Sequence, residues 1–356
     1  MADKIYKVAH FGTGDTGSVA LREIISRPGL ELVGHLVHSP GKAGRDAGEL
    51  VGVAPTGIKA TNDEAAFLAL DADCVSYFAT DYGRDPDEVI GQMCRFLAAG
   101  KNVVTTSMTP LIYPKAVVGG VKDRLDAACR QGNSSFFCSG IVPGFTPDTM
   151  VMAGLSLGTQ VDTVTMSERV PSDDYSDPIS FNMLGFGQPP QPDTGDPAIW
   201  GATFRSSMYM IADGLGMKID EIRNEKKIAL ANKDYVAKAG KIPKGTVSTI
   251  VFHSEAIIGG RPRIFLSMIY PMVGDQDDPF EPRFPEGSTM RRLSRLEIKG
   301  DVDIRLDLSL DNGGMQPGMF CTAARAINAI PDVCEAAPGA LDAFTIPYAA
   351  TGAMKP

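Results

Sequence analysis

Three glycines near the start of the chain have the spacing of a phosphate-binding turn. Gly12, Gly14 and Gly17 form G-x-G-x-x-G, between the apolar run Ile5–Phe11 and a segment, 18–26, with apolar residues at helical spacing. In that context the first glycine makes a tight turn, the second admits a pyrophosphate, and the third lets helix and strand pack closely. The helix that follows presents free backbone N–H groups to the phosphates. The sequence therefore predicts a dinucleotide site on Gly12, Thr13, Gly14, Asp15, Thr16 and Gly17.

The end of the next apolar run, 30–37, indicates which dinucleotide binds. An NAD site usually has Asp or Glu there to bind the ribose hydroxyls. This chain has His38 and Ser39, followed by Lys42 and Arg45. A hydroxyl and two cations suit a 2′-phosphate, so we expect NADP to be preferred and NAD to be possible. The alternative is that Lys42 and Arg45 are ordinary solvated loop charges.

Strand and helix patterns alternate through the first part of the chain. Short apolar runs at 74–79, 102–106 and 134–138 alternate with helical patterns at 85–99 and 115–130. This order is typical of a doubly wound parallel sheet, in which ligands bind beyond the carboxyl ends of the strands. We therefore expect the cofactor also to contact Ala79, Thr80, Thr106 and Gly140.

The pattern changes after residue 148, where strand-like runs follow one another. They predict a second α+β domain with a mostly antiparallel sheet, at 162–169, 222–231, 235–239, 245–256, 262–270, 293–298 and 302–310. A helix is expected at 147–157, another at 204–213, and an apolar helix at 317–330 that packs back on the first domain. The long Pro- and Gly-rich segment 171–200 is expected to be a lid or binding loop. The predicted limits are 1–148, 149–314 and 315–356.

Composition excludes several classes of protein. The chain has 356 residues, 44% of them hydrophobic, and a net charge of −9, which argues against nucleic acid as a partner. Its N-terminus enters the first predicted strand at once, and no apolar run is long enough for a membrane span, so we expect a cytoplasmic protein. Six cysteines without a C-x-x-C pair suggest reduced thiols, and four histidines lack metal-ligand spacing.

Seven segments together carry a resemblance that covers nearly the whole chain. They are HFGTGDTGSVALREI, LVHSPGKAGRDAGELVG, KNVVTT, GIVPGFTPD, GFGQPP, GKIPKGTVS and ARAINAIPDVC. The chain resembles the dihydrodipicolinate reductase-like proteins that include 2,4-diaminopentanoate dehydrogenase and the native amine dehydrogenases. The resemblance implies a Rossmann domain and an α+β substrate domain that supplies the contacts of a homodimer. It also implies nicotinamide-dependent reduction of C=N, or the reverse, on a small-molecule substrate.

The chain departs from that family in two places. Amine dehydrogenases of the family have Cys-Glu-Glu just after the fourth strand, whereas this chain has Ser107, Met108 and Thr109 there, without a carboxylate. The family signature G-x-N-P-G-[FW] is present at 140–145, with Val142 in place of Asn. Because reductive amination needs a group that binds ammonia and moves protons, the first departure argues against ordinary amine dehydrogenase chemistry.

Hydroxyl groups are the remaining candidates for proton transfer. Tyr175 lies in the long aromatic loop, and the resemblance implies that it faces the substrate; its alternative role is packing. Ser107 and Thr109 stand where the glutamates would be, and could hold a water or a substrate oxygen. Each could equally be a loop hydroxyl bonded to nearby backbone.

An apolar pocket is expected from Met108, Phe145 and Met183, although such residues are also common in a core. His253 is interpreted as a hydrogen-bonded core or surface histidine, and Arg205 as a solvated helix charge.

These observations favour an NAD(P)H-dependent oxidoreductase that reduces a small or medium apolar carbonyl, imine or activated C=C substrate. One alternative is an amine dehydrogenase with a relocated acid/base. The other is a non-catalytic NADP-binding sensor.

Overall fold

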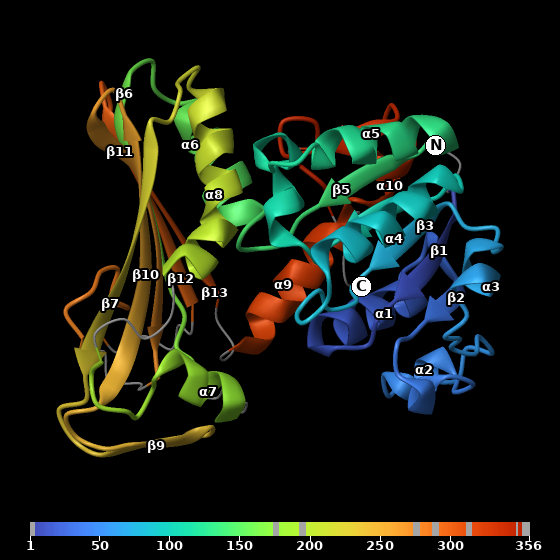
Figure 1. Ribbon diagram of the computed structural model, residues 1–356, viewed down its shortest axis with the longest axis horizontal. Coiled ribbons are helices and arrows are strands. Elements are labelled where there is room, and N and C mark those ends of the chain that lie inside the picture. The colour runs from blue at the N-terminus through green and yellow to red at the C-terminus, as the bar shows by residue number, and fades with distance from the viewer. Residues whose placement is uncertain are drawn as a thin grey trace. The chain divides into compact units, whose positions relative to one another are not determined.

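The computed structural model describes residues 4–173, 178–191, 197–272, 278–286, 292–310, 315–346 and 348–350. The chain divides into two compact units, one of residues 1–145 and 319–356 and one of residues 146–318. Figure 1 shows the elements of both. The C-terminal segment thus belongs to the same unit as the N-terminus.

The first unit is built on a six-stranded sheet whose recorded pairings are all parallel. Its order is β14-β5-β4-β3-β1-β2. From β1, the chain adds β2 on one side and then β3 on the other, so the order in which strands are added reverses between β1 and β3. The strands are β1 (Tyr6–Phe11), β2 (Leu30–Leu36), β3 (Cys74–Tyr77), β4 (Asn102–Thr105), β5 (Ser135–Cys138) and β14 (Gly339–Leu341). The predicted doubly wound parallel sheet is confirmed.

Helices cover both faces of this sheet, because its strands are buried on both sides. On one face Met93 and Phe96 of α4 pack with Leu125 of α5, and on the other Ile24 of α1 packs with Ile327 of α9. The helices are α1 (Asp15–Ser26), α2 (Ala47–Leu50), α3 (Glu64–Leu68), α4 (Pro86–Ala98), α5 (Val121–Gly132), α9 (Met315–Asn328) and α10 (Ile330–Glu335). Short 3-10 helices are η1 (Pro40–Lys42), η2 (Thr109–Ile112) and η3 (Pro114–Ala116).

The helix expected at 115–130 starts later than its sequence pattern indicates. Pro114–Ala116 forms only the 3-10 helix η3, and α5 begins at Val121. Gly119 and Gly120 between them have φ of +81° and +71°. These left-handed conformations interrupt a right-handed helix, and glycine adopts them without the steric cost that other residues meet.

The second unit contains a six-stranded mixed sheet of order β13-β12-β6-β11-β10-β7. The β6–β11 pair is parallel and its other recorded pairs are antiparallel, which confirms a mostly antiparallel sheet. The strands are β6 (Val161–Arg169), β7 (Glu221–Leu230), β10 (Val247–Ile258), β11 (Arg261–Pro271), β12 (Arg292–Gly300) and β13 (Ile304–Leu310). A separate hairpin joins β8 (Tyr235–Ala237) to β9 (Gly240–Ile242), where one longer strand was expected.

Helices pack on one face of the mixed sheet. Figure 1 shows α6 (Met150–Leu155) and α8 (Pro197–Gly214) along this face, where α8 contacts β10 and β7. In the described residues, no helix covers the opposite face. The helix expected at 147–157 is divided into a π-helical turn, η4 (Phe145–Thr149), and α6.

The segment expected to be a long loop, 171–200, is partly helical. It contains α7 (Pro178–Leu184) and the first turn of α8, which begins before the predicted helix at 204–213. Phe181 and Phe186 pack in an apolar cluster with Ile250 of β10, and this burial supports ordered structure in a Pro- and Gly-rich stretch. Among the helices of the described residues, none is sufficiently long and apolar to cross a membrane.

Candidate functional site

The first unit has a cleft of about 500 Å³ at the carboxyl ends of β1, β2, β3 and β4. Twelve of the fourteen residues predicted to bind the cofactor line it: Gly12, Thr13, Gly14, Asp15, Thr16, Gly17, His38, Ser39, Lys42, Ala79, Thr80 and Thr106. It is also lined by Val37, Phe78, Asp81, Ser107 and Met319. The two predicted residues that do not line it are Arg45 and Gly140.

The three glycines of the turn have different surroundings. Gly12 has φ +105°, and a Cβ on it would lie 2.7 Å from the backbone of Phe78. A Cβ on Gly17 would lie 2.8 Å from the carbonyl oxygen of Gly12. In contrast, a Cβ on Gly14 would meet no atom within 4 Å. Gly12 and Gly17 are therefore required by the fold, whereas Gly14 borders open space in the cleft.

The N-terminus of α1 opens onto this space. Gly14 is its N-cap, and no side chain caps the helix. The first backbone N–H groups of a helix have no partner within the helix, and they favour an anion. Together with the free space at Gly14, these groups fit the pyrophosphate of a dinucleotide.

A buried histidine supports the glycine turn from below. His10 of β1 is 0% exposed, and its Nε2 lies 2.6 Å from the carbonyl oxygen of Gly12. Because a carbonyl oxygen only accepts, Nε2 carries the proton, and Nδ1 at 3.2 Å accepts from the Ser76 hydroxyl. Burial, followed by the neighbouring His35, lowers the pKa of His10 to about 3, so the ring is neutral.

Some of the polar side chains that follow β2 line the cleft and others do not. Lys42 lines the cleft, and its Nζ donates to the Thr13 hydroxyl at 2.9 Å and to the Thr13 carbonyl at 3.3 Å. His38 and Ser39 line the same end, and burial, followed by the charge of Arg84, lowers the pKa of His38. Arg45 is exposed and does not line the cleft. Only one of the two predicted cations therefore borders this cleft.

At the other end of the cleft, the loops after β3 and β4 are joined by two hydrogen bonds. The Ser107 hydroxyl donates to the carbonyl oxygen of Ala79 at 2.6 Å. The N–H of Met108 donates to Oδ2 of Asp81 at 3.0 Å. Ser107 is 7% exposed and Asp81 is half-buried, so this end has a hydroxyl and a carboxylate together.

Other predicted residues lie away from the described lining of the cleft. Thr109 begins η2, and Phe145 begins η4 at the end of the first unit. Met108 packs against the hydrophobic core of the first unit, and Met183 of α7 is 57% exposed. Tyr175 lies outside the described residues, so its role stays a prediction.

Gly140 has a packing role. A Cβ on it would lie 3.1 Å from the carbonyl oxygen of Pro143 and 3.2 Å from Cγ2 of Thr322. Because α9 lies so close, packing alone explains why residue 140 is glycine, and no ligand is needed to explain it.

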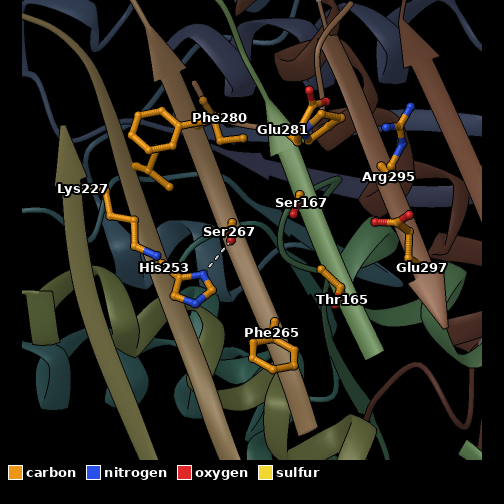
Figure 2. A pocket seen from close by; sticks show the side chains of 13 residues that line it. Thr165, Ser167, Lys227, His253, Phe265, Ser267, Phe280, Glu281, Arg295 and Glu297 are labelled. Atoms are coloured by element: carbon orange, nitrogen blue, oxygen red, sulfur yellow. Dashed lines mark hydrogen bonds between the residues drawn. The ribbon is translucent and has the colours of Figure 1, made fainter. Parts of the chain in front are cut away.

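A second cavity, of about 400 Å³, lies on the open face of the mixed sheet. Figure 2 shows lining side chains on adjacent strands, together with Phe280 and Glu281 outside the strands, and His253 points toward Ser267. His253 Nδ1 is 2.8 Å from the Ser267 hydroxyl, and Nε2 is 3.4 Å from a carboxylate oxygen of Glu255. Burial, followed by the charge of Lys227, lowers the pKa of His253. His253 is thus hydrogen-bonded in a half-buried position.

Cysteines and possible metal ligands give no further site. None of the six cysteines, all of which the structure describes, forms a disulfide bond. In the residues that the structure describes, no group of three His, Cys, Asp or Glu side chains could hold a metal ion.

Sequence reasoning did not identify Asp81, Phe78, Met319 and His10. Asp81 and Phe78 follow β3 directly and could have been included as strand-end residues. Met319 belongs to a helix more than 300 positions along the chain, and no local pattern connects it to the turn.

The chain has relatives of known class. An amine dehydrogenase of Streptomyces virginiae is 32% identical over 346 residues, which are 95% of each chain. Residues 195–355 match the model of the 2,4-diaminopentanoate dehydrogenase C-terminal domain. The structure of an amine dehydrogenase from Mycobacterium smegmatis is similar over 94% of both chains, with a TM-score of 0.71 and 19% identity. A scyllo-inositol dehydrogenase from Lactobacillus casei, solved with NAD(H) and scyllo-inositol, has a TM-score of 0.55 and 12% identity over 97% and 94% of the two chains.

The fold, the cleft at the glycine turn and these relatives define an NAD(P)-dependent oxidoreductase. Within that class, the chain belongs to the amine dehydrogenase family, and its second half matches the 2,4-diaminopentanoate dehydrogenase C-terminal domain. The resemblance predicted from the sequence is confirmed.

Proposed function

We propose that the protein uses NADPH, and less well NADH, to reduce a small or medium apolar carbonyl, imine or activated C=C substrate. The observation that carries the proposal is a single cleft that runs from the glycine turn to Thr106 and Ser107. Met108 stands where the amine dehydrogenases of the family have a glutamate, and this apolar replacement favours an uncharged substrate over a diamino acid.

Amine dehydrogenase activity is the second candidate, and the name of the Streptomyces virginiae relative favours it. Reductive amination would then need an acid/base outside the loop from Ser107 to Thr109. A cofactor-binding sensor without turnover is the third.

One assay separates these functions. NADPH oxidation is followed with a panel of ketones, aldehydes and enones, each with and without a high concentration of ammonium. Activity that is indifferent to ammonium is the expected result. Activity that requires ammonium would establish the amine dehydrogenase, and binding of NADPH without turnover of any substrate would favour the sensor.

The preference for NADP is proposed from the cations after β2. If Lys42 and Arg45 bind the 2′-phosphate, changing both to Ala should weaken NADPH binding at least tenfold and NADH binding much less. The comparison of Lys42→Ala with Arg45→Ala then shows which cation contributes, and the position of Lys42 in the cleft predicts the larger loss for it. An equal loss for both cofactors would contradict the assignment.

Tyr175 is proposed to act in proton transfer or to polarise the substrate. Tyr175→Phe should lower turnover while the affinity for NADPH is unchanged. Unchanged turnover would leave Tyr175 a packing role.

We also propose a cytoplasmic homodimer, in which two copies meet through the open face of the mixed sheet. Val251, Phe265 and Ile269 line the cavity on that face, and apolar groups of this kind favour a protein partner. A two-fold interface would place the same face of each copy together. Light scattering should give the mass of a dimer, and Phe265→Glu should shift it to the mass of a monomer. A monomeric unchanged protein would refute the proposal.

A further inference from the structure

The strands β3 and β4 are parallel neighbours, and Tyr77 pairs with Thr105 at their carboxyl ends. The loops that follow stay together beyond the last pair. Ser107 bonds to the carbonyl oxygen of Ala79, and the N–H of Met108 bonds to the carboxylate of Asp81. This connection holds Asp81 at the edge of the cleft that Ser107 also lines.

The backbone of Met108, whose N–H bonds to Asp81, has a rare conformation. Met108 has φ +58° and ψ +59°, a left-handed conformation that residues other than glycine rarely adopt. In this conformation its N–H donates to Asp81 at 3.0 Å. Backbone in sparsely populated conformations is concentrated at functional sites.

The two carboxylates among the described lining residues lie at different parts of the cleft. Asp15 is the first residue of α1, beside the phosphate turn. Asp81 lies with Ser107 beyond β3 and β4. A dinucleotide crosses the sheet where the strand order reverses, and its adenosine ribose lies at the end of β2. The nicotinamide half of a bound dinucleotide would therefore extend toward β3 and β4, and Asp81 lies at that end.

The Ser107 hydroxyl beside Asp81 already donates a hydrogen bond within the protein. Ser107 donates it to the carbonyl oxygen of Ala79, so toward a ligand Ser107 can only accept a hydrogen bond. The oxygen of Asp81 that Met108 does not bind, Oδ1, has no recorded hydrogen bond in the described part of the chain.

We infer that Asp81 is the carboxylate that exchanges the proton of the reaction with the substrate. This inference rests on the proposed oxidoreductase function. In the oxidative direction, the substrate O–H or N–H bond breaks and its proton passes to Asp81. A bound oxidised nicotinamide would supply the two-electron acceptor for the hydride of the C–H bond, so that the carbon–oxygen or carbon–nitrogen double bond can form. In the direction of reduction, with a reduced nicotinamide as the hydride donor, Asp81 returns the proton to oxygen or nitrogen.

A binding experiment tests the position of Asp81 without a substrate. The oxidised nicotinamide ring is cationic and the reduced ring is neutral, so a nearby carboxylate favours NADP⁺. We expect Asp81→Asn to weaken NADP⁺ binding about threefold or more relative to NADPH, as measured by calorimetry. Asp87→Asn is the matched control, because Asp87 is an exposed carboxylate of α4 paired with Arg124 on the surface. It should leave the ratio of the two dissociation constants unchanged.

Kinetics then test the proton transfer. With a substrate found in the panel assay, Asp81→Ala should lower kcat about 100-fold, as expected for loss of a general base, with little change in the KM for NADPH. Added formate should restore part of kcat in Asp81→Ala and have no effect on the unchanged protein.

The outcomes separate the inference from the proposed function. An unchanged protein that binds none of NADP⁺, NADPH, NAD⁺ and NADH would refute the cofactor assignment, and with it both proposals. If the unchanged protein binds both but Asp81→Asn leaves the ratio as it was, Asp81 is not at the nicotinamide. If the ratio shifts but kcat is retained, Asp81 contacts the cofactor only and the proton-transfer role is wrong.

Discussion

The ring of His10 and the carbonyl oxygen of Gly12 are joined by a hydrogen bond of 2.6 Å within the glycine turn. Gly12 has the left-handed φ that starts the turn, and its carbonyl oxygen is the atom that a Cβ on Gly17 would strike. The bond from His10 therefore fixes the Gly12 peptide, and Gly17 packs against that peptide. It links a buried side chain of β1 to the shape of the cofactor cleft.

The first prediction concerns this bond. His10→Phe keeps a ring but removes the donor, and should weaken NADPH binding about tenfold. A tenfold loss of affinity is close in free energy to the net contribution of a typical hydrogen bond. His10→Gln can donate from a similar position, and should restore most of the affinity. Fluorescence titration with NADPH measures both, with thermal unfolding alongside. Equal affinity of His10→Phe and the unchanged protein would show that Gly12 keeps its conformation without the bond.

The second prediction is a pH dependence of stability. Burial, followed by His35, lowers the pKa of His10 to about 3, and burial, followed by Lys42, lowers the pKa of His35 to about 4, both from 6.5. Below pH 6.5 the unfolded chain binds protons that the folded chain does not. The free energy of unfolding should therefore fall as the pH decreases from 6.5, by about 2 kcal/mol for each histidine at pH 5.

Urea unfolding at several pH values measures this effect. The variant His10→Phe should show a shallower loss of stability between pH 6.5 and pH 5, because one of the histidines with a lowered pKa is absent. The same slope in both proteins would mean that other groups dominate this pH range.

The third prediction separates the roles of two glycines. Gly14→Ala should fold normally, because Gly14 has φ −73° and its Cβ position is open. The new methyl group would occupy the space beside the phosphates and weaken NADPH binding at least tenfold. Gly17→Ala should instead lower the melting temperature, because its Cβ would lie 2.8 Å from the Gly12 carbonyl oxygen. Normal NADPH binding by a folded Gly14→Ala would contradict the placement of the pyrophosphate.

The fourth prediction concerns a buried ion pair in the second unit. Both guanidinium nitrogens Nη1 and Nη2 of Arg169 bond to Asp278, at 2.9 and 2.6 Å, and the two side chains are 0% and 1% exposed. Asp278→Ala leaves a buried charge without its partner, so the free energy of unfolding should fall by about 3–5 kcal/mol.

An exposed pair at the turn between β12 and β13 is the control. Asp303 bonds to Lys299 at 2.7 Å, with side chains 62% and 57% exposed. Exposed pairs contribute about 0–1 kcal/mol, so Asp303→Ala should change the free energy of unfolding little. A similar small loss for Asp278→Ala would show that water or another group compensates Arg169.

The sequence by itself determined the glycine turn between the first strand and helix and the class of each domain. The turn depends on residues within a few positions of one another, and the roles of Gly12, Gly14 and Gly17 follow from local spacing. Alternation of strands and helices, or of strands alone, is likewise a local periodicity that burial imposes on each element. The sequence therefore sufficed to predict a parallel sheet in the first domain and a mostly antiparallel sheet in the second.

The tertiary structure decided which distant groups meet. Asp81 and Met108 are 27 positions apart and meet because β3 and β4 are neighbours in the sheet. The position of Lys42 inside the cleft and of Arg45 outside it depends on the path of the chain after β2, although both are cations of the same segment. The parallel pairing of β6 with β11 in a sheet of antiparallel pairs has no local signal either. In each case the physical reason is that strand pairing and packing are chosen by the whole fold, whereas spacing and periodicity belong to the segment.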